Sequence, residues 1–244
     1  MLIVMAIMAL LVGLLVPALR SARAASQRSA CASNLRQVHL ANVAYSTAND
    51  GRLAPGASEF HRNLSRWFGT RRDVREVFEP RGGPLSVYLG PEGAVRQCPS
   101  FMPGPRVNGL DFEAGCGGYG YNNAYLGVRE DRRDSVGVRL SSIARPGETV
   151  MFTDAALAMP APSLRLIEYS FAEPPMQRDS NYPLDPSLHF RHGGEASTAW
   201  ADGHVSRQRL AFTRGNIYGV SESQMRNLRI GWFGPATNRF FDLR

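Results

Sequence analysis

The sequence predicts an α+β protein, in which a long N-terminal helix packs on a head domain built around an antiparallel β-sheet. Two observations support this prediction. Residues 20–49 contain neither Gly nor Pro and are rich in helix formers, whereas residues 51–244 hold short apolar runs separated by Gly and Pro. A helix followed by strand-length runs and turn residues is typical of the α+β class. The composition, 43% hydrophobic and 20% charged, is that of a folded chain.

The first segment, Met1 to Leu19, carries no charged or polar side chain. As a helix it would rise about 28 Å, close to the hydrocarbon thickness of a bilayer. Its apolar residues occupy every side, which favours lipid or a deep protein core. We therefore expect residues 1–19 to span a membrane. The alternatives are a buried helix and a cleaved secretory signal, although no basic residues precede the apolar run as they do in most signals.

Residues 20–50 continue the same helix in amphipathic form. Five of them recur at spacings of four and three, which places them on one stripe of the helix: Cys31, Leu35, Val38, Asn42 and Tyr45. We expect this stripe to lie on the head domain, residues 51–244. Pro17 is expected to kink the helix without ending it, whereas Gly51 suits the left-handed position that follows a helix C-terminus.

Strands of the head are expected where apolar or alternating residues stand between turns. Residues 118–127 have Tyr at alternate positions, and residues 148–154 form an apolar run. A third run, 196–201, is followed by Asp202-Gly203, which is a strong two-residue hairpin turn, and by a return strand that begins at His204. These segments predict an antiparallel sheet with a hairpin near its C-terminal end.

Two other segments have weaker patterns. Residues 63–78 are expected to contain a short helix. Residues 160–186 carry six prolines and are expected to form a long surface loop.

The net charge of +7 does not indicate a nucleic-acid-binding protein. All 28 basic residues other than His are Arg, with no Lys, and they are spread along the whole chain. No basic helix interleaved with aromatic residues is present, so no nucleic-acid partner is expected.

The chain has three cysteines, Cys31, Cys98 and Cys116, which allow at most one internal disulfide. We expect Cys98 and Cys116 to pair, because both lie in loop-like sequence that would be outside the cytosol. Neither belongs to a Cys-x-x-Cys pair, so a structural zinc site is not expected.

The order of motifs resembles a known family. Its landmarks here are the apolar helix, Cys31 to Gln37, Asn49 to Leu53, Cys98-Pro99-Ser100, Tyr119 to Asn122, Pro146 to Asp154, and His192 followed after nine residues by Asp202-Gly203. This arrangement is similar to the type IV pilins and type II secretion pseudopilins, in the bacterial subgroup with a C-terminal His-x9-Asp-Gly motif.

The resemblance implies a structural subunit of a membrane-rooted filament or type II secretion-like apparatus, not an enzyme. It implies assembly with other pilin-like subunits through the N-terminal helix, and contacts of the head with secretion machinery or exported cargo. The implied location is the inner membrane, crossed once, with a periplasmic head. Such subunits are made as prepilins, which a peptidase cleaves after Gly and methylates at the new N-terminus.

The sequence departs from the family at its start. With Pro17 aligned to the family's helix proline, Met1 falls inside the usual mature helix, and the Gly cleavage residue and assembly Glu do not occur. We expect the reading frame to begin upstream; the alternative is a copy that is not processed. In addition, Arg20, Arg23 and Arg28 follow the span, and this charge asymmetry alone predicts a cytoplasmic head.

A metal-dependent function is the competing hypothesis. Asp154, Asp202 and His204 could form a Ca²⁺ site, since carboxylates suit calcium and some pseudopilins use calcium to order a loop. The alternative function is then a membrane-tethered extracytoplasmic binding module or metal-dependent enzyme that uses these three residues. The simpler interpretation is that Asp202-Gly203 serves turn geometry and that His192 pins the start of its strand by hydrogen bonding. The sequence has no HExxH motif or nucleophile elbow.

Overall fold

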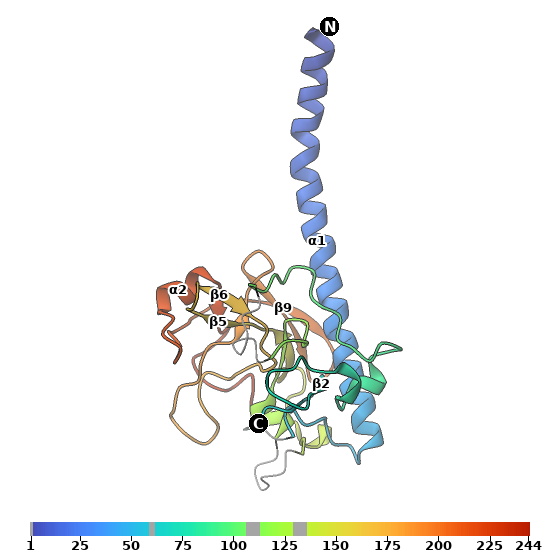
Figure 1. Ribbon diagram of the computed structural model, residues 1–244, viewed down its shortest axis with the longest axis vertical. Helices are drawn as coiled ribbons and strands as arrows, with labels where there is room; N and C mark the ends of the chain where they lie inside the picture. Colours follow the sequence, from blue (N-terminus) through green and yellow to red (C-terminus); the bar gives the residue numbers. More distant parts are fainter. Residues whose placement is uncertain (1, 59–61, 106–112, 129–135) are drawn as a thin grey trace.

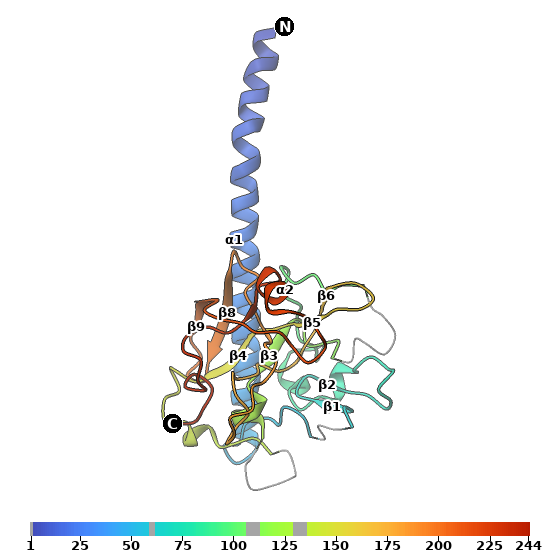
Figure 2. The ribbon, with the colours of Figure 1, turned by 90° about the vertical axis from the view of Figure 1, so that its left-hand side faces the viewer.

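The structure, a computed structural model, describes residues 2–58, 62–105, 113–128 and 136–244. One long helix, α1 (Leu2–Ala48), projects from a head that contains the other described residues (Figures 1 and 2). The head consists of short antiparallel strands joined by turns, so the α+β class is confirmed.

The strands and the second helix are all short. In chain order they are β1 (Ser65–Arg66), β2 (Gly69–Thr70), β3 (Tyr119–Tyr121), β4 (Val150–Asp154), β5 (Leu157–Met159), β6 (Arg165–Ile167), β7 (Leu188–His189), β8 (Glu195–Trp200), β9 (Val205–Arg209), α2 (Glu222–Asn227) and β10 (Ile230–Gly231). Short 3₁₀ segments occur at Pro80–Gly82, Ser86–Tyr88 and Leu140–Ser142, and a π-helical turn at Asn123–Gly127.

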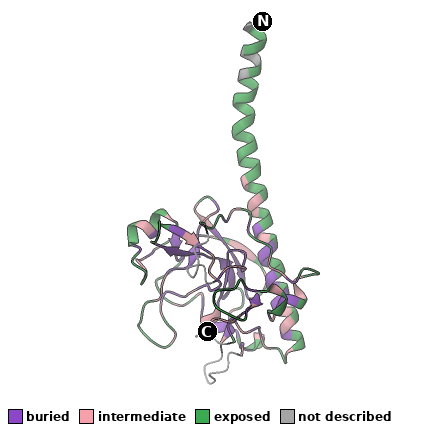
Figure 3. Cartoon of the chain, in the orientation of Figure 1, coloured by how far each residue is buried: buried purple, intermediate pink, exposed green. Residues whose placement is uncertain are grey.

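The N-terminal half of α1 stands clear of the head at every position whose side chain the structure describes. Eleven large apolar side chains between Ile3 and Leu19 are 40–77% exposed, and Figure 3 colours the described residues of this half almost entirely as exposed. The helix continues through Pro17 and is long and apolar enough to cross a membrane.

The second half of α1 lies on the head, as its stripe predicts. Cys31, Leu35, Val38 and Asn42 are buried, and Tyr45 is partly buried against the core. The buried face is wider than the stripe, because Asn34, His39, Ala41 and Ser46 are buried too. The predicted end is also confirmed: Gly51 has φ +74°, and its backbone N–H donates to the carbonyl of Ser46 at 2.8 Å.

The central sheet has the order β3-β4-β8-β9 and is antiparallel throughout. The predicted strands at 148–154 and 196–201 correspond to β4 and β8, and the hairpin through Asp202-Gly203 leads into β9. α1 packs against β8 and β4 on one side. Val150 and Trp200 pack on the other side with the C-terminal segment around Trp232, which explains why all five residues of β4 are buried.

Three predictions for the head are corrected. Residues 63–78 hold the β1–β2 hairpin instead of a helix. Only Tyr119–Tyr121 of the segment 118–127 is a strand, and the chain then enters the π-helical turn. Residues 160–186 are not simply a surface loop, since β6 pairs with β5 and Phe171 is buried. The first and third differences are local hairpins whose turns the pattern did not identify, whereas β3 pairs with β4, about 30 residues further along the chain.

Candidate functional site

A disulfide joins α1 to the head, and it is not the expected one. Cys31 of α1 is bonded to Cys98, with their Cα atoms 5.0 Å apart, and Cys116 is a free, buried thiol. The predicted Cys98–Cys116 pairing is therefore wrong. The prediction rested on Cys98 and Cys116 both lying in loop-like sequence, yet the stripe that buries Leu35 and Val38 brings Cys31 directly onto the loop that carries Cys98. Burial raises the pKa of the Cys116 thiol well above its ordinary value.

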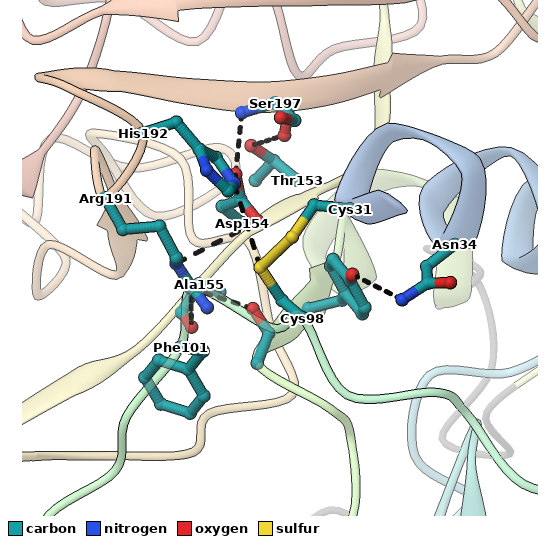
Figure 4. A network of polar contacts seen from close by, with 12 residues as sticks. Cys31, Asn34, Cys98, Phe101, Thr153, Asp154, Ala155, Arg191, His192 and Ser197 are labelled. Atoms are coloured by element: carbon teal, nitrogen blue, oxygen red, sulfur yellow. Dashed lines mark hydrogen bonds and ion pairs between the residues drawn. A yellow bond between two sulfur atoms is a disulfide. The ribbon is translucent and has the colours of Figure 1, made fainter. Parts of the chain in front are cut away.

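Next to the disulfide lies a buried cluster of charged and polar groups (Figure 4). Asp154 ends β4, and its Oδ2 accepts a hydrogen bond from the backbone N–H of Ser197 in β8 at 2.7 Å. The Nε2 atom of His192 lies 3.2 Å from the same oxygen and 3.7 Å from the Sγ of Cys98. The side chains of Asp154 and His192 are 0% and 1% exposed. His192 therefore joins the turn before β8 to the end of β4.

Arg191 supplies the positive charge of this cluster. Its Nη2 donates to the carbonyls of Gly118 and Ala155, and its guanidinium stacks over Phe101 at 4.3 Å from the ring centroid. Its Nε is 3.9 Å from Asp154 Oδ1. Burial lowers the pKa of Arg191, and the charge of Asp154 opposes part of that change. The guanidinium thus compensates a carboxylate that would otherwise be buried without a counter-charge.

The cluster contains Cys, His and Asp, but not in the geometry of a nucleophilic triad. In such a triad one imidazole nitrogen faces the nucleophile and the other faces the carboxylate. Here Cys98 and Asp154 both face Nε2 of His192, and Nδ1 has no hydrogen-bond partner among the described residues. The sulfur of Cys98 is also committed to the disulfide. The arrangement can fix the helix, the sheet and the turn to one another, and it is not poised for nucleophilic attack.

The Asp202-Gly203 turn forms the predicted hairpin. Oδ1 of Asp202 accepts from the backbone N–H of His204 at 3.0 Å and lies 2.7 Å from its Nδ1. Gly203 has φ +95°, and a Cβ at this position would lie 3.0 Å from Cε1 of His39 in α1. The Nε2 of His39 donates to the carbonyl of Ala201 at 3.2 Å, in the tautomer that places hydrogen there. Gly203 is therefore required both by its backbone conformation and by the close approach of α1.

The three residues predicted to bind calcium do not come together. Asp154 is at the far end of β4 from Val150, which pairs with Trp200 of β8. Four residues of strand span about 13 Å, and Asp202 lies beyond Trp200. Asp154 is buried with His192, whereas Asp202 and His204 are roughly half exposed, at 41% and 49%. The structure thus separates Asp154, which contacts His192, from Asp202 and His204, which contact each other.

A groove of about 800 Å³ lies beside the turn, between α1 and the segment that precedes β4. Its apolar lining includes Leu40 and Val43 of α1 together with Ile143 and Pro146. Leu40 is 58% exposed, so an apolar strip of α1 stays accessible where the helix runs along the head.

Sequence reasoning missed two members of the buried cluster. Cys31 was recognisable as a buried residue from its place on the helical stripe, but no spacing identified its partner. Arg191 carried no signal, since it is one of many arginines and only the antiparallel register brings Asp154 near it.

Comparisons of the chain with protein-family models, with characterised proteins and with solved structures find no match.

Proposed function

We propose that this chain is a pilin- or pseudopilin-like structural subunit of a membrane-rooted filament or type II secretion-like assembly. Its N-terminal helix is the anchor and the contact to other subunits. Its head lies on the extracytoplasmic side of the inner membrane, where it would contact neighbouring subunits, secretion machinery or exported cargo.

One observation carries the proposal: α1 is a single helix whose first half is exposed and apolar and whose second half is part of the head core. Burying a large apolar side chain is worth about 1.5–3 kcal/mol, so the exposed half represents on the order of 10–30 kcal/mol of unburied apolar surface. Lipid or the helices of other copies must cover it. Because no break separates the two halves, a contact at the anchor is transmitted to the head as a rigid body.

The attachment of α1 to the head supports a load-carrying subunit more than a flexible tether. The disulfide fixes Cys31 to Cys98. Further along the helix, Asn34 donates to Tyr119 Oη at 3.2 Å, and Asn42 accepts from the backbone N–H of Ala54 at 2.8 Å. These contacts fix the helix at three levels along its docked half, so its direction relative to the head is defined.

The disulfide also supports an extracytoplasmic head. Disulfides persist in oxidising compartments and are rare in the cytosol. The arginines that follow the span, beginning with Arg20, favour the opposite orientation by the positive-inside rule. We give the disulfide more weight, because it requires an oxidising environment, whereas charge asymmetry is a statistical bias that upstream sequence can reverse.

Site-directed crosslinking tests the assembly. Cysteines are placed one at a time at positions 10–16 of the full chain in membranes and oxidised with copper phenanthroline. The wild-type chain offers a low background, because Cys116 is buried and the other two cysteines are bonded. We expect dimers at positions on one side of the helix, with the three-to-four-residue period of a helix contact. Weak crosslinking without periodicity, together with a monomer after detergent extraction, would indicate a tethered binding module instead.

The orientation has its own test. Val87 is 79% exposed on the head, so a cysteine in its place is open to solvent. A membrane-impermeant maleimide should label Val87→Cys in intact spheroplasts as strongly as in lysed ones. Labelling only after lysis would place the head in the cytoplasm and contradict this part of the proposal.

A further inference from the structure

Four potential metal-ligating groups meet in the buried cluster, although they come from four parts of the chain (Figure 4). Cys31 is on α1, Cys98 is on a loop, Asp154 ends β4 and His192 lies in the turn before β8. The two sulfurs and one imidazole nitrogen lie within 4.8 Å of one another, and all three residues are buried. Asp154 Oδ2 is 3.2 Å from His192 Nε2 and so lies next to this set of three donors, outside their mutual spacing of 4.8 Å.

Two of the donor spacings are close to those of tetrahedral zinc. Bond lengths of about 2.3 Å to sulfur and about 2.0 Å to nitrogen or oxygen place tetrahedral neighbours roughly 3.5 Å apart for S–N and roughly 3.3 Å apart for N–O. The observed separations are 3.7 Å for Cys98 Sγ to His192 Nε2 and 3.2 Å for His192 Nε2 to Asp154 Oδ2. Two spacings differ in the disulfide form: the sulfurs are bonded to each other, and Asp154 lies outside the set of donors within 4.8 Å of one another, so its carboxylate must move toward the sulfurs to bind the same ion.

His192 Nε2 and Asp154 Oδ2 already face each other in the disulfide form, and the other polar atoms of the two side chains, Nδ1 and Oδ1, would stay outside the coordination shell of the metal. The charges also balance with a metal: two thiolates and the carboxylate of Asp154 oppose Zn²⁺ and the guanidinium of Arg191. A buried set of donors is stable only when such charges are compensated.

We propose that, when the Cys31–Cys98 disulfide is reduced, the two cysteines bind one Zn²⁺ together with His192 Nε2 and Asp154 Oδ2. A dithiol reductant transfers two electrons and two protons to the sulfurs and becomes a cyclic disulfide itself. Zinc binding then displaces the two thiol protons to solvent. Metal and disulfide are alternative occupants of one place, and each fastens α1 to the same point of the head.

The consequence is that the helix remains clamped in both redox environments. A chain that folds before it meets an oxidising compartment would use the metal, and the oxidised chain would use the disulfide. This site is distinct from the expected Ca²⁺ site, with which it shares only Asp154.

Cobalt substitution tests the proposal on the full chain in detergent. Because the site is buried, the protein is unfolded with a phosphine reductant and refolded with Co²⁺, which gives visible bands when tetrahedral and a charge-transfer band for each thiolate. We expect about one Co²⁺ per chain, two thiolate ligands, and stoichiometric displacement by Zn²⁺. The oxidised chain, treated identically without reductant, should bind none.

Variants identify the ligands. Cys116→Ala is the matched control, since it removes the third cysteine and should leave both the spectrum and the affinity unchanged. His192→Ala and Asp154→Asn should each lower the affinity at least tenfold, about the smallest effect that even an outer-sphere change has in metal sites. If His192→Ala does not fold, the thiolate-to-cobalt bands of the reduced wild-type chain still test whether the metal binds. A reduced chain that is folded by circular dichroism yet shows no thiolate-to-cobalt band would overturn the proposal, as would a band abolished in Cys116→Ala.

Discussion

Removing the Cys31–Cys98 disulfide should be among the most damaging small changes to this chain. The bond closes a loop of 67 residues. On the chain-entropy model a loop of that size is worth about 4 kcal/mol at 25 °C, because the cross-link reduces the freedom of the unfolded chain. A domain is typically stable by about 5–15 kcal/mol, so the Cys31→Ala/Cys98→Ala variant should lose a large part of its stability.

The measurement is urea unfolding of the full chain in detergent, with EDTA present so that no metal replaces the bond. Fluorescence reports on the head, because Trp67 and Trp232 are buried in its two main apolar clusters. Cys116→Ala is the control for loss of a buried sulfur without loss of a cross-link. The reasoning would be refuted if the unfolding free energy of the double variant lay within about 1 kcal/mol of that of Cys116→Ala. Such a result would mean that the bond does not reduce the conformational freedom of the unfolded chain.

Three further predictions concern single residues of the head. Gly203→Ala should cost about 2–4 kcal/mol, because a Cβ there meets the imidazole on α1, whereas Gly194→Ala should cost about 1–2 kcal/mol from backbone strain alone. Asp154→Asn should cost about 3–5 kcal/mol, since it leaves the buried guanidinium of Arg191 without its carboxylate. Burial raises the pKa of Glu173 from its ordinary 4.5 to about 7. The folded state therefore holds that proton more tightly, and stability present below pH 4.5 is lost as pH rises through 7, by on the order of 1–3 kcal/mol.

Denaturant unfolding measures all three, each with its own control. For the glycines the informative quantity is the difference in unfolding free energy between the Gly203→Ala and Gly194→Ala variants, because both positions have positive φ. Equal losses of stability would show that α1 shifts to make room for the added methyl group. For Asp154 the comparison is Asp202→Asn, which alters a half-exposed carboxylate and should cost under about 1 kcal/mol. For Glu173 the unfolding free energy is followed between pH 4.5 and 8, and Glu173→Gln should flatten the profile. An unchanged slope in that variant would assign the pH dependence to another group.

The long helix was predictable because its cause is local. Apolar residues on every side, a Gly-free continuation and a stripe at helical spacing depend only on neighbours along the chain. The same holds for the hairpin, since Asp202-Gly203 determines a turn through its own backbone preferences. What the pattern could not reveal is that the glycine also makes room for His39, because that contact spans 164 positions, the difference between residues 203 and 39.

The candidate site was predictable in some of its members but not in its grouping. Sequence patterns singled out Asp154, His192 and Asp202 as residues with chemistry, and they assigned Asp154 to the wrong partners. The register of β4 against β8 and the position of α1 across both strands decide which side chains meet. Neither can be inferred from the local periodicity of the sequence. The disulfide is the clearest case. Any two of three cysteines could pair by sequence, and only the docking of the helix brings Cys31 to Cys98.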